Sequence, residues 1–216
     1  YAGATTVSAG QLTVSGLLAD TSTVVVNGGV YDLNAGSDTV AGVQITSGTI
    51  QNGTLTSTSA FDVQAGTISA VLAGAVGLNK TTGGVATLSG TTANTYSGLT
   101  TVSAGTLNLN KTATVDAIAG NLTVSGGSAV LQAANQINNA SNVVVSGGIL
   151  DIANFSDTVN GVKLTSGNIN GTGGTLTSAT AFDLQAGTAS AILGGTAGAN
   201  KTGVGMMTLS GANTFS

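Results

Sequence analysis

The sequence predicts an all-β protein, a right-handed parallel β-helix (β-solenoid) of about eleven coils of roughly 19–22 residues each. Three observations indicate this fold. A six-residue pattern recurs nine times, apolar and polar residues alternate on both sides of it, and the 216 residues include 34 glycines and no proline. A strand-like unit that returns with a period of about 20 residues is typical of a solenoid.

The recurring pattern consists of an aliphatic residue, a polar residue, a small residue, glycine, any residue and usually an apolar residue. Its glycines are Gly10, Gly29, Gly48, Gly66, Gly105, Gly127, Gly148, Gly167 and Gly187. The position numbers of successive glycines differ by 19, 19, 18, 39, 22, 21, 19 and 20, and the interval of 39 holds one irregular extra unit around Lys80 to Gly90. The polar–small–glycine triplet predicts a tight corner, where glycine is favoured because such turns often need positive φ.

The residues before and after each corner predict strands with one buried face. Apolar residues flank a polar one before the corner in Val43-Gln44-Ile45, and after it in Leu107-Asn108-Leu109 and Leu150-Asp151-Ile152. Such alternation has the period of a strand. Each coil is therefore expected to be strand, turn, strand and a looser return. Since one coil cannot bury its apolar face alone, we expect stacked coils with parallel strands, right-handed winding and a rod about 50 Å long.

The composition argues against several classes of function. Four lysines and eight aspartates are the only charged residues, and histidine, cysteine, tryptophan, arginine and glutamate are absent. The usual general base, the thiol nucleophile and the soft metal ligands are therefore missing. So few cationic groups argue against nucleic-acid binding. No long apolar run predicts a membrane helix, and no signal peptide is expected because the chain already starts within a repeat.

A second level of repetition groups the coils. Residues 1–10 match residues 96–105 at an offset of 95, and residues 213–216 match residues 94–97 at an offset of 119. We expect one solenoid segment over 1–216, with cassette one at 1–95, cassette two at 96–214 and the start of a third at 215–216. The longer offset corresponds to about one additional coil in cassette two. Neither end has an evident cap, so we expect part of a longer array or a subunit of an end-to-end filament.

Residues 77–109 resemble the passenger-associated transport repeat of bacterial autotransporters. The resemblance covers about a third of the chain. The matching residues are Lys80-Thr81, Leu88-Ser89-Gly90, Asn94-Thr95-Tyr96, Gly98 and Thr100 to Leu107. A second copy runs from Asn200 to Phe215, and the tail of another begins at Tyr1. The resemblance implies a right-handed β-helix exported to the surface of a Gram-negative bacterium within a large adhesin-like protein. The signal and outer-membrane barrel of a complete autotransporter are not seen in this sequence, which leaves the export route open.

Candidate site residues are few, and no catalytic, cofactor-binding or metal site is predicted. Phe61-Asp62 and Phe182-Asp183 recur in equivalent coils, where we expect an inward Phe beside an outward, solvated Asp rather than calcium ligands. Asp32 and Asp38, like Asp151 and Asp157, are six residues apart, too far to share one strand face simply. Paired aspartates support glycoside hydrolysis in some β-helix enzymes, but no tryptophan supplies a sugar platform.

Two further motifs receive structural interpretations. Asn79, Asn110 and Asn200 each begin an Asn-Lys-Thr sequon, which we attribute to chance and turn chemistry. Lys80 and Lys201 are expected in the corner of the irregular coil, where they would discourage edge pairing. Threonines do not form an unbroken outward ladder, as a flat ice-binding face would require.

The sequence therefore predicts a non-enzymatic structural segment, a rigid stalk or filament subunit for adhesion, matrix or fibre formation, located extracellularly. Its expected partners are further copies of the same repeat end to end, in the same chain or as a homopolymer, with a host or matrix surface as a further candidate. No cofactor, nucleic acid or membrane insertion is expected. The alternatives are a β-helical carbohydrate-active enzyme, which predicts long loops with clustered aspartates, and an ice-binding solenoid.

Overall fold

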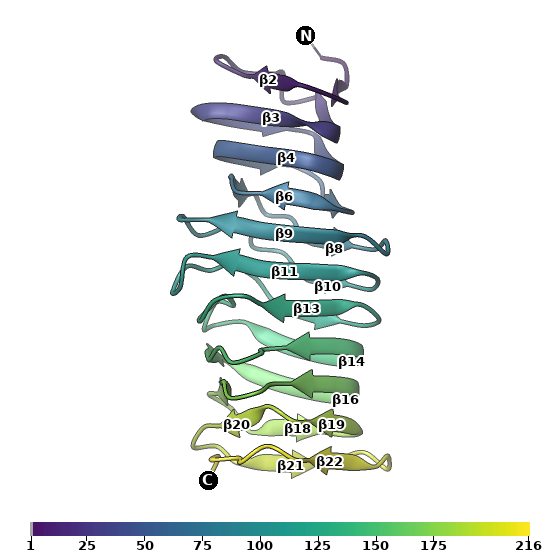
Figure 1. The fold of residues 1–216 in the computed structure, drawn as a ribbon, viewed down its shortest axis with the longest axis vertical. Helices are drawn as coiled ribbons and strands as arrows, with labels where there is room; N and C mark the ends of the chain where they lie inside the picture. Colours follow the sequence, from purple (N-terminus) through teal and green to yellow (C-terminus); the bar gives the residue numbers. More distant parts are fainter. Residues whose placement is uncertain (1) are drawn as a thin grey trace.

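The computed structural model describes residues 2–216 and shows an all-β, right-handed parallel β-helix (Figure 1). In Figure 1 the nearer strands run to the left and the more distant ones to the right as the chain descends from its N-terminal end, which gives the winding its right hand. Tyr1, which the sequence comparison pairs with Tyr96, lies outside the described residues. Among residues 2–216 there is no helix that is long and apolar enough to cross a membrane.

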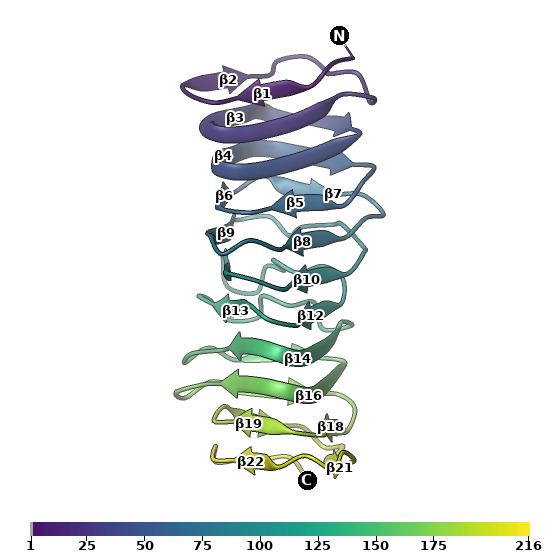
Figure 2. The same cartoon turned by 90° about the vertical axis from the view of Figure 1, so that its right-hand side faces the viewer.

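Each coil has three faces, and the first carries the strand that precedes the corner (Figure 2). One strand segment per coil gives eleven coils, as predicted. These segments are β1 (Thr5–Val7), the starts of β3 (Thr23–Val40) and β4 (Gly42–Ser57), β5 (Phe61–Val63), β8 (Leu78–Lys80), β10 (Thr100–Val102), β12 (Leu122–Val124), the starts of β14 (Asn142–Asp151) and β16 (Gly161–Asn170), β18 (Phe182–Leu184) and β21 (Ala199–Lys201).

The second and third faces complete the coil. The second is formed by β2 (Gln11–Thr13), the middle of β3 and β4, β6 (Gly66–Ile68), β9 (Val85–Gly90), β11 (Thr106–Lys111), β13 (Ser128–Leu131), the ends of β14 and β16, β19 (Gly187–Ala189) and β22 (Met207–Leu209). The third is formed by the ends of β3 and β4, β7 (Val71–Ala73), β15 (Asp157–Val159), β17 (Thr175–Ser178) and β20 (Ile192–Gly194). Between β7 and β15 the third face is reduced to one isolated bridge, Ile118 to Ile137, which matches the looser return expected from the sequence.

Every described strand pairing is parallel and joins one coil to the next. Coil length varies along the stack. Thr100 lies opposite Leu122 in one of the longest coils, whereas Phe61 lies opposite Leu78 in one of the shortest. The shortest coils are therefore shorter than predicted.

The interior is one continuous apolar column. In the internal coils the residues predicted to point inward on the first face, among them Val24, Phe61 and Leu122, are buried. The alternation predicted from the sequence is therefore confirmed. At the two ends of the stack the inward residues stay partly open, with 37% of Leu12 and 39% of Leu209 exposed.

Close packing between adjacent coils, which was not predicted from the sequence, also requires glycine at the corners. Gly10, Gly48, Gly66, Gly105, Gly167 and Gly187 have positive φ as expected, but Gly29, Gly127 and Gly148 do not. A Cβ on Gly127 would lie 2.7 Å from the carbonyl oxygen of Gly105 in the coil before it, and one on Gly148 would be still closer to that of Gly127. Glycine is thus required where two coil backbones approach closely.

The unit around Lys80 to Gly90, predicted to be irregular, is a full coil of the stack with an irregular corner. Its strands β8 and β9 pair with the coils on both sides. The corner of this coil is longer than that of the coil before it. As a result Gly66 lies opposite Ala86 and not opposite a corner glycine. The same step recurs in cassette two, where Gly187 lies opposite Met207.

Candidate functional site

The aspartates were the main candidate site residues, and the structure places Asp32 and Asp38 in different environments. Asp32 lies on the second face, where its Oδ2 accepts hydrogen bonds from the amides of Gln11 (3.0 Å), Gln51 (2.9 Å) and Asn52 (3.0 Å). The hydrogen bond from Gln51 is the main cause that lowers the pKa of Asp32. These partners belong to the coils on either side of Asp32, so this carboxylate joins three successive coils.

Asp38 is buried on the third face, with 4% of its surface exposed. Its Oδ2 accepts hydrogen bonds from the Tyr31 hydroxyl (3.5 Å) and the Leu18 amide (3.3 Å). Its Oδ1 is a buried oxygen with no hydrogen-bond partner among the described residues. Burial, followed by the nearby Asp38 carboxylate, raises the pKa of Tyr31.

Asp151 and Asp157 are the equivalents of Asp32 and Asp38 in cassette two, and their hydrogen-bond partners differ. Asp151 accepts a hydrogen bond from the amide of Ala153 (2.8 Å). Asp157 is buried and binds backbone amides of the preceding coil, Gln136 (2.9 Å) and Ile137 (3.1 Å). Burial raises its pKa to about 6, against the hydrogen bonds that lower it. The structure does not bring either pair together as two facing carboxylates; each aspartate fastens backbone or side-chain amides.

Side-chain amides have the same role where the third face lacks strands. Asn94 is buried; its Oδ1 accepts from the amide of Leu72 (3.0 Å), and its Nδ2 donates to the carbonyl of Ala117 (2.8 Å). Asn213, its equivalent in cassette two, accepts from the amide of Leu193 (2.8 Å). This role of asparagine was not predicted, although the repeated Asn-Thr-Tyr and Asn-Thr-Phe strings were a signal for it.

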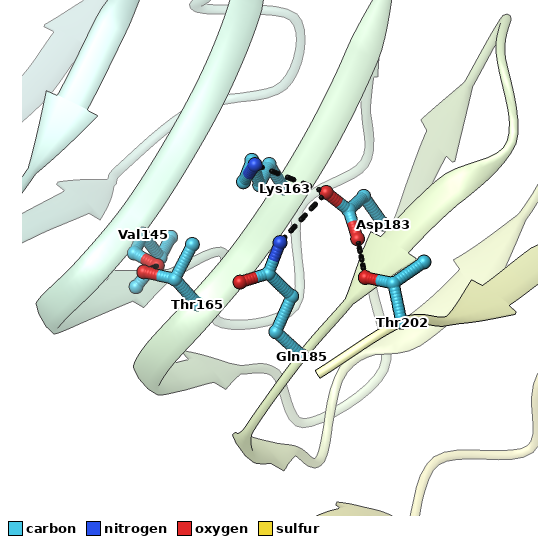
Figure 3. A network of polar contacts seen from close by, with 6 residues as sticks. All are labelled: Val145, Lys163, Thr165, Asp183, Gln185 and Thr202. Carbon is cyan, nitrogen blue, oxygen red and sulfur yellow. Dashed lines mark hydrogen bonds and ion pairs between the residues drawn. The ribbon is translucent and has the colours of Figure 1, made fainter. Parts of the chain in front are cut away.

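The Phe-Asp dipeptides are arranged as predicted in part. Phe61 and Phe182 are buried, while Asp62 and Asp183 point outward. Asp183 is engaged by other side chains as well as by solvent, as Figure 3 shows: Lys163 Nζ lies 3.2 Å from Oδ2, Gln185 Nε2 3.0 Å from Oδ2 and Thr202 Oγ1 2.5 Å from Oδ1. The hydrogen bond from Thr202 is the leading cause that lowers the pKa of Asp183. Lys163 lies in β16, Asp183 in β18 and Thr202 directly after β21, so this network spans three successive coils.

The expected position of Lys80 is wrong. Lys80 is fully buried in β8, and its ammonium group donates to the carbonyls of Thr82 and, in the next coil, Ala104 (3.2 Å). Lys111 is buried in the same way and donates to the carbonyl of Ser89 (2.8 Å). Burial lowers the pKa of both lysines, that of Lys111 to about 8. Lys201, the equivalent of Lys80 in the last coil, is exposed and donates to the carbonyl of Gly203.

The Asn-Lys-Thr strings are not turns, contrary to expectation. Asn79, Asn110 and Asn200 lie in strands β8, β11 and β21, with their side chains exposed. Asparagine is exposed in all three strings, whereas lysine is buried in the first two and exposed in the last.

The outer surface carries a broad hollow and a short run of threonines. The hollow has a volume of about 590 Å³ and is lined mainly by polar residues, including Asp32, Asn52, Ser69 and Thr92. On the second face Thr49, Thr67 and Thr87 lie opposite one another, and the following position is occupied by an asparagine. Over residues 2–216, no group of three or more His, Cys, Asp or Glu residues is placed to hold a metal ion.

Comparison of this chain with protein families, with curated proteins and with solved structures found no match.

Proposed function

We propose that this segment is a non-enzymatic structural rod, a rigid stalk or filament subunit of an extracellular bacterial surface protein that serves adhesion, matrix or fibre formation. One observation carries the proposal: eleven coils stack in parallel register around an uninterrupted apolar column. Stacked coils of this kind contact only their neighbours and form an extended body.

The polar residues support a mechanical role. Asp32, Asp157 and Asp183 each accept several hydrogen bonds that join successive coils. A glycosidase needs one carboxylate placed to give a proton and a second placed to attack or to activate water. Asp32, Asp157 and Asp183 each fasten one coil to the next, which favours a mechanical role for these carboxylates.

The resemblance noted in the sequence supports the bacterial surface location. Lys80 and Asn94, two residues of the matching segment, form hydrogen bonds between successive coils. Lys80 bonds to Ala104, and Asn94 bonds to Leu72 and Ala117. Repeat residues that connect coils suit a passenger region whose task is to remain folded outside the cell. Labelling of intact cells of the source bacterium with antibody against this segment tests the location.

The rigid-rod proposal is tested by spin labels at Thr6 and Asn200. Both point outward, and strand pairing places them in one column, ten coil steps apart. At about 4.8 Å per coil we expect a narrow distance distribution near about 48 Å. A chain without cysteine can be labelled at two introduced cysteines alone. A broad distribution, or a mean far below this value, would contradict a stiff spacer.

A further inference from the structure

The broad hollow on the outer surface lies where the second face of the coil turns into the third. Its lining extends over four successive coils, from Asp32 in the coil of β3, through Thr54 and Ser69, to Thr92 in the coil that starts with β8. At about 4.8 Å per coil this is a length of about 14 Å. The volume of about 590 Å³ lies within the range of sites that hold small organic ligands.

The hollow exists because the corners that surround it differ in length. Asp32 lies opposite Gln51 and Gly36 opposite Gly53, so the corner of the β3 coil has two residues more than that of the β4 coil. On the other side of the hollow, residues 91–92 belong to the loop that follows β9 and are exposed. The two longer corners form the walls, and the shorter corners between them form the floor.

Asp32 is a fixed hydrogen-bond acceptor in the hollow, and only 7% of its surface is exposed. Its Oδ2 is occupied by the side-chain amides of Gln11, Gln51 and Asn52. Its Oδ1 accepts one hydrogen bond, from the backbone amide of Asn34 (2.8 Å), and has room for a second donor. The hydrogen bonds from Gln51 and from the Asn34 amide lower the pKa of Asp32. The carboxylate is therefore ionised at neutral pH and is a strong acceptor.

Several other polar side chains in the lining are available to a ligand. The side chain of Asn34 and the hydroxyl groups of Thr54, Ser69 and Thr92 have no hydrogen-bond partner among residues 2–216. None of the four lysines is among the described residues that line the hollow, and the apolar side chains there are small. The site thus presents closely spaced hydroxyl and amide groups around one anionic acceptor.

The equivalent corner of cassette two is built differently. Asn34 is replaced there by Ala153, and the corner that contains Gly171 is two residues longer than its equivalent in cassette one. Ser190 corresponds to Ser69, and its hydroxyl accepts a hydrogen bond from the Gly171 amide (3.3 Å). Formation of the coil therefore requires neither the asparagine nor an unused serine hydroxyl, so the polar lining of the hollow needs another explanation.

We propose that this hollow binds a neutral carbohydrate. Hydroxyl groups of the sugar donate to Asp32 Oδ1 and exchange hydrogen bonds with the side chains of Asn34 and Ser69. A sugar suits this lining because its hydroxyl groups, like those of serine and threonine, both donate and accept. This binding activity is additional to the proposed rod and does not depend on the stiffness of the rod.

Other classes of ligand suit the hollow less well. The ionised Asp32 repels an anionic ligand, and no lysine of the described lining offsets this repulsion. A calcium ion takes about six to eight oxygen ligands, but Asp32 is the only acidic residue in the described lining and its Oδ2 is occupied by N–H donors. A peptide cannot add as a further strand, because the strands around the hollow are already paired on both sides.

Titration of the whole chain with small ligands, followed by proton–nitrogen correlation NMR, tests the proposal. The neutral probes are maltose, cellobiose, lactose and N,N′-diacetylchitobiose at millimolar concentration. Glucuronic acid and the tripeptide glycyl-lysyl-glycine represent the other ligand classes. We expect at least one neutral probe to cause saturable shifts of the amides of residues 32–35, 52–54 and 69–71, whereas glucuronic acid should leave these amides unshifted.

Two substitutions remove one hydrogen-bonding group each. Asn34→Ala and Ser69→Ala should each weaken binding by about three- to tenfold. Alanine is compatible with the backbone at position 34, because Ala153 adopts φ 49° in the equivalent corner. Ser190→Ala, the matched change in cassette two, should bind the probe like wild type.

The proposal is overturned if no neutral probe causes saturable shifts, or if the shifted amides lie outside the hollow. It is also overturned if the chain with both Asn34→Ala and Ser69→Ala binds like wild type. Tighter binding of glucuronic acid or of the tripeptide than of every neutral probe would assign the hollow to another class of ligand. The spin-label distance reports on the rod alone, so the rod and the carbohydrate site can fail separately.

Discussion

Replacement of Asp157 by asparagine tests whether this buried side chain fastens one coil to the next. It also tests whether the contribution of Asp157 to the free energy of unfolding depends on pH. Asp157 is 1% exposed and accepts hydrogen bonds from the amides of Gln136, Ile137 and its neighbour Thr158. Asparagine keeps the shape of the side chain and does not titrate. One of its two positions becomes an NH₂ group, so at least one amide loses its acceptor, at a cost of about 1–3 kcal/mol.

The pH dependence follows from the pKa of Asp157, which burial raises from its ordinary value of 3.8 to about 6 in the folded chain. The folded state binds this proton more tightly than the unfolded state does. The stabilising contribution of the carboxyl group is therefore fully present below about pH 4 and is lost as pH rises through about 6. At about 1.4 kcal/mol per pKa unit the whole loss is about 3 kcal/mol, of which about 2 kcal/mol falls between pH 4.5 and 7.

Urea unfolding followed by circular dichroism at pH 4.5 and 7 measures this effect. We expect Asp157→Asn to be less stable than wild type at pH 4.5, and the gap between the two free energies of unfolding to shrink by about 2 kcal/mol at pH 7. Asp116, which lies near Asp157 and raises its pKa slightly, remains in both proteins. The reasoning is refuted if the gap is the same at both pH values or widens at pH 7.

Two further predictions concern groups at other coil contacts. Burial lowers the pKa of Lys111 from its ordinary 10.5 to about 8, so the charged lysine destabilises the folded chain. This destabilisation is complete below about pH 8 and is relieved as pH rises to about 10.5. Over this range Lys111 should therefore add up to about 3 kcal/mol to the free energy of unfolding of wild type. Lys111→Met lacks this contribution and should gain up to about 3 kcal/mol less than wild type over the same range, because Lys80, whose pKa burial also lowers, titrates in both proteins. Between pH 4.5 and 7 the pH dependence of the variant should match that of wild type. Gly148→Ala should destabilise by about 1–3 kcal/mol in urea unfolding, since its Cβ would lie 2.7 Å from Cγ1 of Val124, whereas Gly83→Ala should change stability by less than about 1 kcal/mol. Equal stability of the two alanine variants would contradict close coil contact as the reason for glycine.

Local patterns were sufficient to predict the coil itself. Val43-Gln44-Ile45 shows why: alternation with period 2 fixes which side chains point inward, and the register between coils follows from the spacing of the repeats. The parallel pairing of Val43 with Val24, its equivalent in the coil before, is the direct result. Corner glycines were located for the same reason, although their close approach to the previous coil was not.

The contacts of the buried polar residues could not be predicted in the same way, because the two partners of each contact are about one coil apart in sequence. Nothing next to Asp157 indicates that it binds the amides of Gln136 and Ile137 in the preceding coil. The misplacement of Lys80 has a different cause. The alternation in Leu78-Asn79-Lys80 already places lysine on the same side as the buried leucine, but its charge favoured an exposed corner. The structure resolves the conflict by surrounding the ammonium group with backbone carbonyls, which makes burial of a lysine tolerable.

Whether such a residue is buried depends on the coil that covers it and not on its own sequence. Lys80 and Lys201 occupy equivalent strands in the same tripeptide, yet only the first is buried. Gly105 and Gly10 occupy equivalent corners, yet only the first has a neighbour within reach of a Cβ. Local sequence therefore determines the shape of a coil, while its stability is a property of the contact between two coils. It follows that substitutions at corresponding positions should have unequal effects along this chain, large at an internal contact and small at an uncovered one. An equally destabilising effect of Gly105→Asn and Gly10→Asn on the monomer would contradict this view.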